Sequence, residues 1–163
     1  MNDSGTVLKP GKKTLLLWND TCREKQITVW MGSYRTMFRK EIYFVQPILD
    51  LVGSRPLGER FDLNGDMIRL ARPKMFAFKR MGTKCVRCGI EGKFFAKERF
   101  PDQHVYHLNL YGVKESGENV MLTVDHIIPK VAGGENTIEN YQTMCWECNQ
   151  VKDSYVRKGV GKF

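Results

Sequence analysis

The chain has 163 residues and a formal net charge of +8. This length fits one domain or two small ones. The sequence has no apolar run of about 18 residues, and its polar N-terminus lacks the apolar stretch of a signal peptide, which argues against a membrane span and against secretion. We therefore expect a cytoplasmic protein.

Positive charge is concentrated in the first half of the chain. Residues 1–80 hold 15 Lys and Arg against 8 Asp and Glu, whereas residues 81–163 hold 11 against 10. A basic region beside a near-neutral one favours a polyanionic partner, above all nucleic acid, although a merely solvated basic surface is the alternative. We expect a boundary near residue 80, with residues 1–80 forming a basic, β-rich DNA-binding arm or subdomain.

The first half of the chain shows mixed patterns. Two apolar stretches rich in β-formers, Thr14–Trp18 and Gln26–Met31, predict strands. Residues 34–52 fit neither a helical nor a strand period, and Pro47 would break or begin an element there. The dipeptide Asn64-Gly65 between two extended segments predicts a tight hairpin.

The second half gives a clearer succession of elements. Pro129 is expected to end the strand before it. A short extended segment and then a C-terminal helix follow a Gly-rich loop. The expected elements are strands at 93–97, 105–111 and 120–127, a turn at 116–119, an extended segment at 140–144 and a helix from near 145 to about 157.

Four cysteines form two C-x-x-C pairs, Cys85/Cys88 and Cys145/Cys148. In a reducing cytosol such pairs indicate a metal site rather than disulfides, and two pairs supply the four thiolates of a tetrahedral Zn²⁺. The 56 residues between Cys88 and Cys145 exceed the usual zinc-ribbon interval, so spacing alone does not impose this pairing. Four unrelated buried thiols or a redox dithiol are the alternatives.

Asp125 and His126 lie between the two cysteine pairs. A carboxylate is a hard ligand suited to Mg²⁺, and a neutral imidazole is a general base at neutral pH. Neighbouring side chains of a regular strand point to opposite faces, so both residues can serve one site only where the strand ends or kinks. Pro129 favours such an end.

One face of the predicted C-terminal helix carries Cys145, Cys148, Asn149 and Lys152, at i, i+3, i+4 and i+7. Asn149 could direct a carbonyl oxygen to a second metal ion, and Lys152 could meet a DNA phosphate as a point charge. Alternatively, both are polar surface residues. Lys130, just past the strand, is either a contact to the DNA backbone or a solvated lysine.

The run from Leu122 to Lys152 resembles the HNH endonuclease motif in its four-cysteine zinc form. With the first cysteine pair, the resemblance covers residues 81–158 and leaves out the first 80. Small free-standing HNH enzymes of phages and mobile elements have this pattern, and a phage-borne protein would act in the host-cell cytoplasm. The landmarks are Asp125-His126-Ile127-Ile128-Pro129, Gly133-Gly134, Asn140-Tyr141 and Cys145-x-x-Cys148-Asn149-x-x-Lys152.

The resemblance implies an α+β fold, in which a ββα-metal module with structural zinc occupies residues 81–163 and follows the basic N-terminal region. It implies that His126 is the general base that deprotonates water. Asp125 and Asn149 would bind a catalytic Mg²⁺ or Mn²⁺, and Asn140 would brace the loop between the strands. The third motif letter is Asn149 rather than His, which makes this an H-N-N variant.

These features favour a divalent-metal-dependent endonuclease that hydrolyses DNA phosphodiester bonds. A zinc-stapled DNA-binding module without catalysis is the alternative from another class, but it has no need of Asp125, His126 and Asn149 together. RNA is the alternative substrate. The protein is expected to be a monomer that nicks or a homodimer that breaks both strands, and the sequence does not decide between them.

Overall fold

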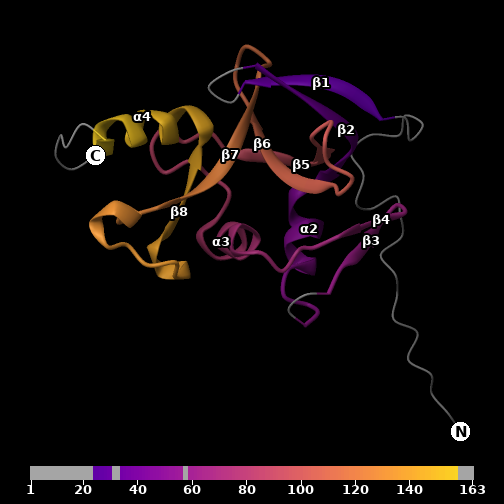
Figure 1. Ribbon diagram of the computed structural model, residues 1–163, viewed down its shortest axis with the longest axis horizontal. Coiled ribbons are helices and arrows are strands. Elements are labelled where there is room, and N and C mark those ends of the chain that lie inside the picture. Colours follow the sequence, from indigo (N-terminus) through magenta and orange to yellow (C-terminus); the bar gives the residue numbers. More distant parts are fainter. Residues whose placement is uncertain (1–23, 31–33, 57–58, 158–163) are drawn as a thin grey trace, which may run out of the picture.

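A six-stranded antiparallel sheet forms the body of the protein (Figure 1). The computed structural model describes residues 24–30, 34–56 and 59–157. The strands lie in the order β1-β2-β5-β6-β7-β8. Their bounds are β1 Lys25–Trp30, β2 Tyr34–Phe44, β5 Gly92–Arg99, β6 His107–Val113, β7 Asn119–His126 and β8 Tyr141–Cys145.

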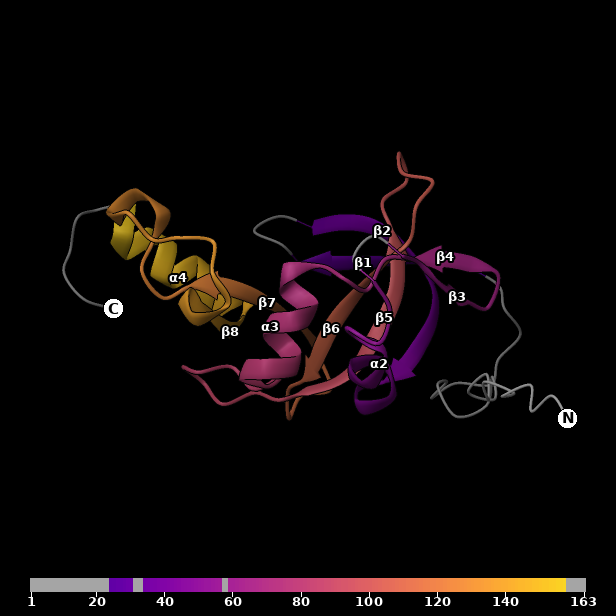
Figure 2. The same ribbon diagram turned by 90° about the horizontal axis from the view of Figure 1, so that it is seen from below.

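Among the residues that the structure describes, three α-helices and a small second sheet lie beside this sheet. Figures 1 and 2 show α4 at one end of the molecule and the β3–β4 hairpin at the other, with α3 between β8 and α2. Within the described ranges, no helix has the length and apolar character that a membrane crossing requires. The bounds are α2 Val45–Leu51, β3 Phe61–Leu63, β4 Asp66–Ile68, α3 Pro73–Met81 and α4 Trp146–Arg157, with short 3-10 helices η1 Lys130–Ala132 and η2 Ile138–Asn140.

The main core lies where α2 and α3 contact the sheet. Ile48 of α2 and Phe78 of α3 are buried in one cluster with Phe95 and Leu110 of the sheet. Each large apolar side chain buried in this way stabilises the fold by about 1.5–3 kcal/mol. A second, smaller cluster, built around Tyr111, contains residues of β2, β5, β6 and β7.

Most of the predicted elements are confirmed. Gln26–Met31 corresponds to β1, and the hairpin turn has the positive φ angles that its type requires, 54° at Asn64 and 85° at Gly65. The ambiguous segment 34–52 divides into β2 and α2, and Pro47 lies in the first turn of α2, where its missing N–H has no helical partner to lose. The strand predicted at Thr14–Trp18 lies outside the described residues.

The second half also follows the prediction, and the mixed α+β class is confirmed. The boundary expected near residue 80 falls in the last turn of α3, which ends at Met81, shortly before the first cysteine pair. Strands from both sides of this point share one sheet, because β2 pairs directly with β5. The assignment of residues 1–80 to DNA binding and of 81–163 to catalysis stays a prediction.

A buried ionic cluster fastens the β3–β4 hairpin to the sheet. The Lys97 ammonium on β5 is fully buried and contacts Glu41 Oε2 of β2 at 2.5 Å, Asp66 Oδ2 of β4 at 2.7 Å and the Leu63 carbonyl of β3 at 2.6 Å. Burial works to raise the pKa values of Glu41 and Asp66, but hydrogen bonds outweigh it and leave both pKa values lowered. For Glu41 these bonds come from Lys97, Tyr43 and Asn64, and for Asp66 from Lys40 and Lys97. We call Lys97, Glu41, Asp66 and Leu63 the Lys97 cluster.

Candidate functional site

The four paired cysteines come together where β8 meets α4. Their sulfur atoms all lie within 4.8 Å of one another, and the Sγ atoms of Cys88 and Cys145 are 3.7 Å apart. Zinc–sulfur bonds of about 2.3 Å in a tetrahedron place neighbouring sulfur atoms about 3.8 Å apart. The donor set and its spacing therefore suit a tetrahedral metal ion such as zinc.

Backbone hydrogen bonds shape the turn that presents the first pair. Gly89 N donates to the Cys85 carbonyl at 3.0 Å, and Gly89 adopts a φ of 77°, which favours glycine. Val86 N donates to the Thr143 carbonyl at 3.0 Å, and the Thr143 hydroxyl donates to the Gly82 carbonyl at 2.6 Å. These bonds hold the turn against β8, which brings Cys85 and Cys88 to Cys145.

The thiols of the cluster differ in acidity. Burial works to raise the pKa of Cys85, but backbone hydrogen bonds, the largest from Cys145, outweigh it and lower the pKa to about 7. Burial raises the pKa of Cys148 to about 11 and also raises that of Cys145. A metal ion would thus meet one acidic thiol and displace protons from the others, so its binding would release protons.

Asp125 lies on β7 and is held from two sides. Its Oδ2 accepts a hydrogen bond from Gln142 Nε2 of β8 at 2.8 Å and another from the ammonium of Lys152 on α4. Among the described residues, no donor bonds to Oδ1. The carboxylate is thereby fixed in position and keeps one oxygen available as a ligand.

Lys152 is buried, with only 5% of its surface exposed. Besides its ion pair with Asp125, it donates to the backbone carbonyl of His126. The ammonium thus has internal partners and ties α4 to the last two residues of β7. The DNA contact predicted for Lys152 stays a prediction.

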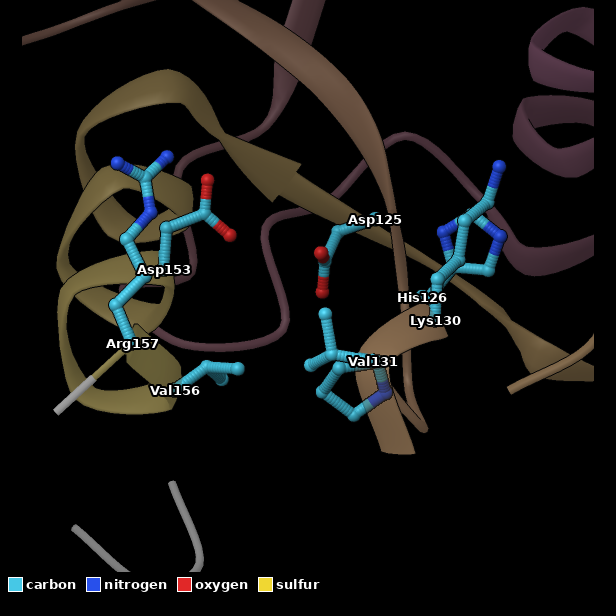
Figure 3. Close-up of a pocket in the computed structure, with 8 residues that line it drawn as sticks. Asp125, His126, Lys130, Val131, Asp153, Val156 and Arg157 are labelled. Atoms are coloured by element: carbon cyan, nitrogen blue, oxygen red, sulfur yellow. The ribbon is translucent and has the colours of Figure 1, made fainter. Parts of the chain in front are cut away.

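His126 ends β7 and lies beside Asp125 in an open cleft of about 250 Å³. Figure 3 shows the Asp125 carboxylate on the α4 side of β7 and the His126 imidazole on the other side. His126 Nε2 lies 2.8 Å from Asn136 Oδ1. An amide oxygen only accepts, so this bond places the proton on Nε2 and the free lone pair on Nδ1.

Asn149 brings a carbonyl oxygen to the same face of β7 as Asp125. Its Nδ2 donates to the Thr123 hydroxyl at 3.3 Å, and Thr123 precedes Asp125 by two residues, so both strand residues point toward α4. The Asn149 Oδ1 is buried and, among the described residues, has no hydrogen-bond partner. Leaving such a group unsatisfied costs about 1–3 kcal/mol, which a metal ligand role would offset.

Asn140 joins the two sides of the loop between β7 and β8. Its Oδ1 accepts from Ile128 N at 2.8 Å, and its Nδ2 donates to the carbonyls of Ile128 and Glu135 at 3.1 and 2.9 Å. Gly134 lies against the same carbonyl, where an added Cβ would come within 1.8 Å of the Ile128 oxygen. These contacts hold the loop that follows His126 in one conformation.

Four further residues of this region were not predicted from the sequence. Asn136 and Gln142 contact His126 and Asp125, whereas Asp153 and Arg157 line the cleft from α4. Helical spacing could have found the last two, because Asp153 and Arg157 follow Asn149 by one and two turns on the same face. Lys130, predicted as a DNA contact, also lines the cleft (Figure 3), and its contact stays a prediction.

Comparisons with known proteins bear on part of the chain. Residues 112–154, from the end of β6 into α4, match the family described as HNH endonuclease. This segment contains Asp125, His126, Asn140 and Asn149, and the first cysteine pair lies before it. Comparisons with curated proteins and with solved structures give no match. The chain therefore carries an HNH endonuclease domain at residues 112–154.

Proposed function

We propose that this protein is a divalent-metal-dependent endonuclease that hydrolyses phosphodiester bonds of DNA. The family match supports nuclease-type chemistry in general. The observation that carries the finer proposal is the buried, unpartnered Oδ1 of Asn149, on the helix face that meets Asp125. A carboxylate oxygen and an amide oxygen are the hard ligands that Mg²⁺ and Mn²⁺ prefer.

Asp125 and Asn149 would hold the catalytic ion. Gln142 and Lys152 fix Oδ2 of Asp125, so the carboxylate would offer Oδ1. When bound, a divalent ion supplies charge stabilisation at the scissile phosphate and the leaving oxygen. The four cysteines would hold a structural Zn²⁺ and thereby set the position of Asn149, which directly follows Cys148.

His126 would take the proton from the attacking water through Nδ1, with Asn136 holding its tautomer. Attacking and leaving oxygens lie roughly in line across phosphorus. His126 and Asp125 line one cleft, although their side chains project to opposite sides of β7 (Figure 3). Both would therefore act on one phosphate only where it lies at the end of β7, which is His126. General-base catalysis of this kind contributes about 10²–10⁴-fold to the rate.

Lys130 and Arg157 would contact the phosphate backbone on either side of the cleft. Phosphate contacts position the duplex without reading its sequence. Their presence on both walls supports a polyanionic substrate.

The test is cleavage of plasmid DNA, and of matched DNA and RNA duplexes, with Mg²⁺ or Mn²⁺. We expect His126→Ala to slow DNA cleavage by about 10²–10⁴-fold while zinc content and circular dichroism stay unchanged. His104→Ala, at an exposed position outside the cleft, is the matched control and should cleave normally.

Two outcomes would contradict the proposal. If folded, zinc-loaded His126→Ala cleaves DNA as fast as the wild type, the assigned mechanism is wrong. If the wild type cleaves the RNA duplex and leaves DNA intact, the substrate is wrong.

A further inference from the structure

A second, smaller hollow lies where α3 begins, apart from the cleft. Its walls are Arg69, Arg72, Lys74 and His107, and the apolar side chains of Met75 and Leu108 complete it. The hollow encloses about 10 Å³, which is close to the space that one water oxygen needs. It can receive a single oxygen atom of a ligand but neither a base nor a whole nucleotide.

Positive charge in this hollow is not matched by negative charge. The described residues that line it include no carboxylate, and none within the described ranges forms an ion pair with Arg69, Arg72 or Lys74. Glu98 acts on the charge of Lys74, but it is fully buried and already accepts hydrogen bonds from Arg39, Tyr111 and Asn109. Carboxylates surround the lysine of the Lys97 cluster, whereas the Lys74 ammonium donates to a neutral acceptor, Asn109 Oδ1, at 3.2 Å.

The cations of the hollow work against one another. Burial and the neighbouring Arg72 lower the pKa of Lys74 to about 8, against a weaker opposite effect of Glu98. Burial also lowers the pKa of His107, with further contributions from Arg72 and Lys74. An anion that entered the hollow would relieve this repulsion and raise the pKa of Lys74 again.

We propose that Arg69, Arg72 and Lys74 bind a phosphate group of the nucleic-acid backbone, at a site separate from the HNH cleft. This inference rests on the proposed function, which supplies the nucleic acid. Arginine guanidinium groups match phosphate geometry with two parallel hydrogen bonds, and the size of the hollow limits the contact to phosphate oxygen. The contact positions the duplex and reads no bases.

Helix α3 connects this site to the cleft region. Arg72 precedes α3, whereas Arg80 in its last turn pairs with Glu139 of η2 at 2.9 Å, and η2 also carries Asn140. The eight steps from Arg72 to Arg80 span about 12 Å at a helical rise of about 1.5 Å per residue. Successive phosphates of one strand advance about 3.4 Å, so this span corresponds to roughly three or four nucleotides. A duplex of about 20 base pairs is therefore much longer than the stretch of α3 that leads from this site to η2.

The experiment measures duplex binding with the full-length, zinc-loaded His126→Ala protein, which should bind without cutting. Fluorescence anisotropy would follow binding of a duplex of about 20 base pairs between about 50 and 200 mM salt. Adding Arg69→Gln and Arg72→Gln should weaken binding several-fold at low salt. The slope of log K against log salt should also fall by about one, for one lost phosphate contact. Both arginines are exposed, so the fold should be retained.

The matched control carries Arg60→Gln and Lys93→Gln, which remove the same charge from exposed positions elsewhere. If both double variants lose affinity equally, general charge explains the effect and the site is excluded. If the parent binds DNA and the Arg69/Arg72 variant keeps its slope, this site alone is wrong. If the parent binds no duplex, the proposed function fails as well.

Inorganic phosphate is titrated separately, and binding of free phosphate at this site without any effect on DNA binding would overturn the assignment to the nucleic-acid backbone.

Discussion

Two buried lysines hold two different parts of the molecule. Lys97 is fully buried, and its three partners in the Lys97 cluster each accept a hydrogen bond from its ammonium group. Lys152 is nearly as buried and holds Asp125, but beside it the Asn149 Oδ1 has no partner among the described residues. Buried polar groups are normally satisfied, and exceptions concentrate at functional sites. Lys97 thus belongs to the structural framework. Lys152 belongs to a site in which a buried acceptor, Asn149 Oδ1, would gain its partner from a ligand.

Removal of zinc should have the largest effect and should separate the two regions. Structural zinc sites contribute about 10–16 kcal/mol of binding free energy, which is folding free energy for the segments they join. We expect Cys145→Ser to abolish cleavage and to remove hydrogen-exchange protection from β8 and α4, while β4 and β5 around Lys97 stay protected. If the variant lacks zinc but keeps full protection in α4 and full activity, the four cysteines do not position the site.

Lys97→Met should destabilise the framework without touching the cleft. Removing one partner of a buried ion pair leaves uncompensated charge, at a cost of about 3–5 kcal/mol. Urea unfolding should show this loss as a lower midpoint, whereas Lys93→Met, at an exposed position of the same strand, should change stability by less than about 0.5 kcal/mol. Equal midpoints for the two variants would mean that the Lys97 cluster does not stabilise the fold.

Asn136→Ala should have the smallest effect and should lower the cleavage rate without changing the stability of the fold. Without the acceptor at Nε2, the imidazole of His126 loses its fixed tautomer. By analogy with residues that orient catalytic and metal-bound histidines, the cleavage rate should fall by about 10–100-fold at unchanged stability. Asn119→Ala, at the exposed first residue of β7 and outside the cleft, should cleave like the wild type. A normal rate in Asn136→Ala would show that the tautomer is set by other contacts.

Local patterns predicted most of the fold. Turn residues and runs of β-forming side chains mark β6, β7 and the β3–β4 hairpin, because these elements depend on neighbours close in sequence. Helix α3 was not predicted, although Pro73 at its start and Gly82 after its end are typical boundary residues. The strand predicted at 93–97 is shorter than β5, because adjacent charged residues such as Lys97 and Glu98 usually mark the exposed end of a strand. Only the pairing of β5 with β2 and β6, and the ion pair of Lys97 with Asp66 of β4, explain their burial.

The sequence predicted the motif residues of the candidate site but not the residues that hold them in place. The motif identifies Asp125, His126 and Asn149 because their spacing on a strand and a helix is itself the signal. Gln142 cannot be found in this way, since it meets Asp125 only through the pairing of β7 with β8. The internal partners of Lys152 are equally invisible in the sequence. A lysine on a helix face is most often exposed, and only the packing of α4 on β7 encloses this one.

The pairing of β7 with β8 has a further consequence for the protein's tolerance to change. Leu122 lies opposite Cys145 and Asp125 opposite Gln142, so the cysteine and the carboxylate are three residue pairs apart on one ladder. A slip of one residue would turn every side chain of a strand to the other face and would bring Val124 or His126 to the place of Asp125. By holding Cys145 to the first cysteine pair, the metal site would fix this register. Insertions or deletions within β8 should therefore be far more harmful than most substitutions there.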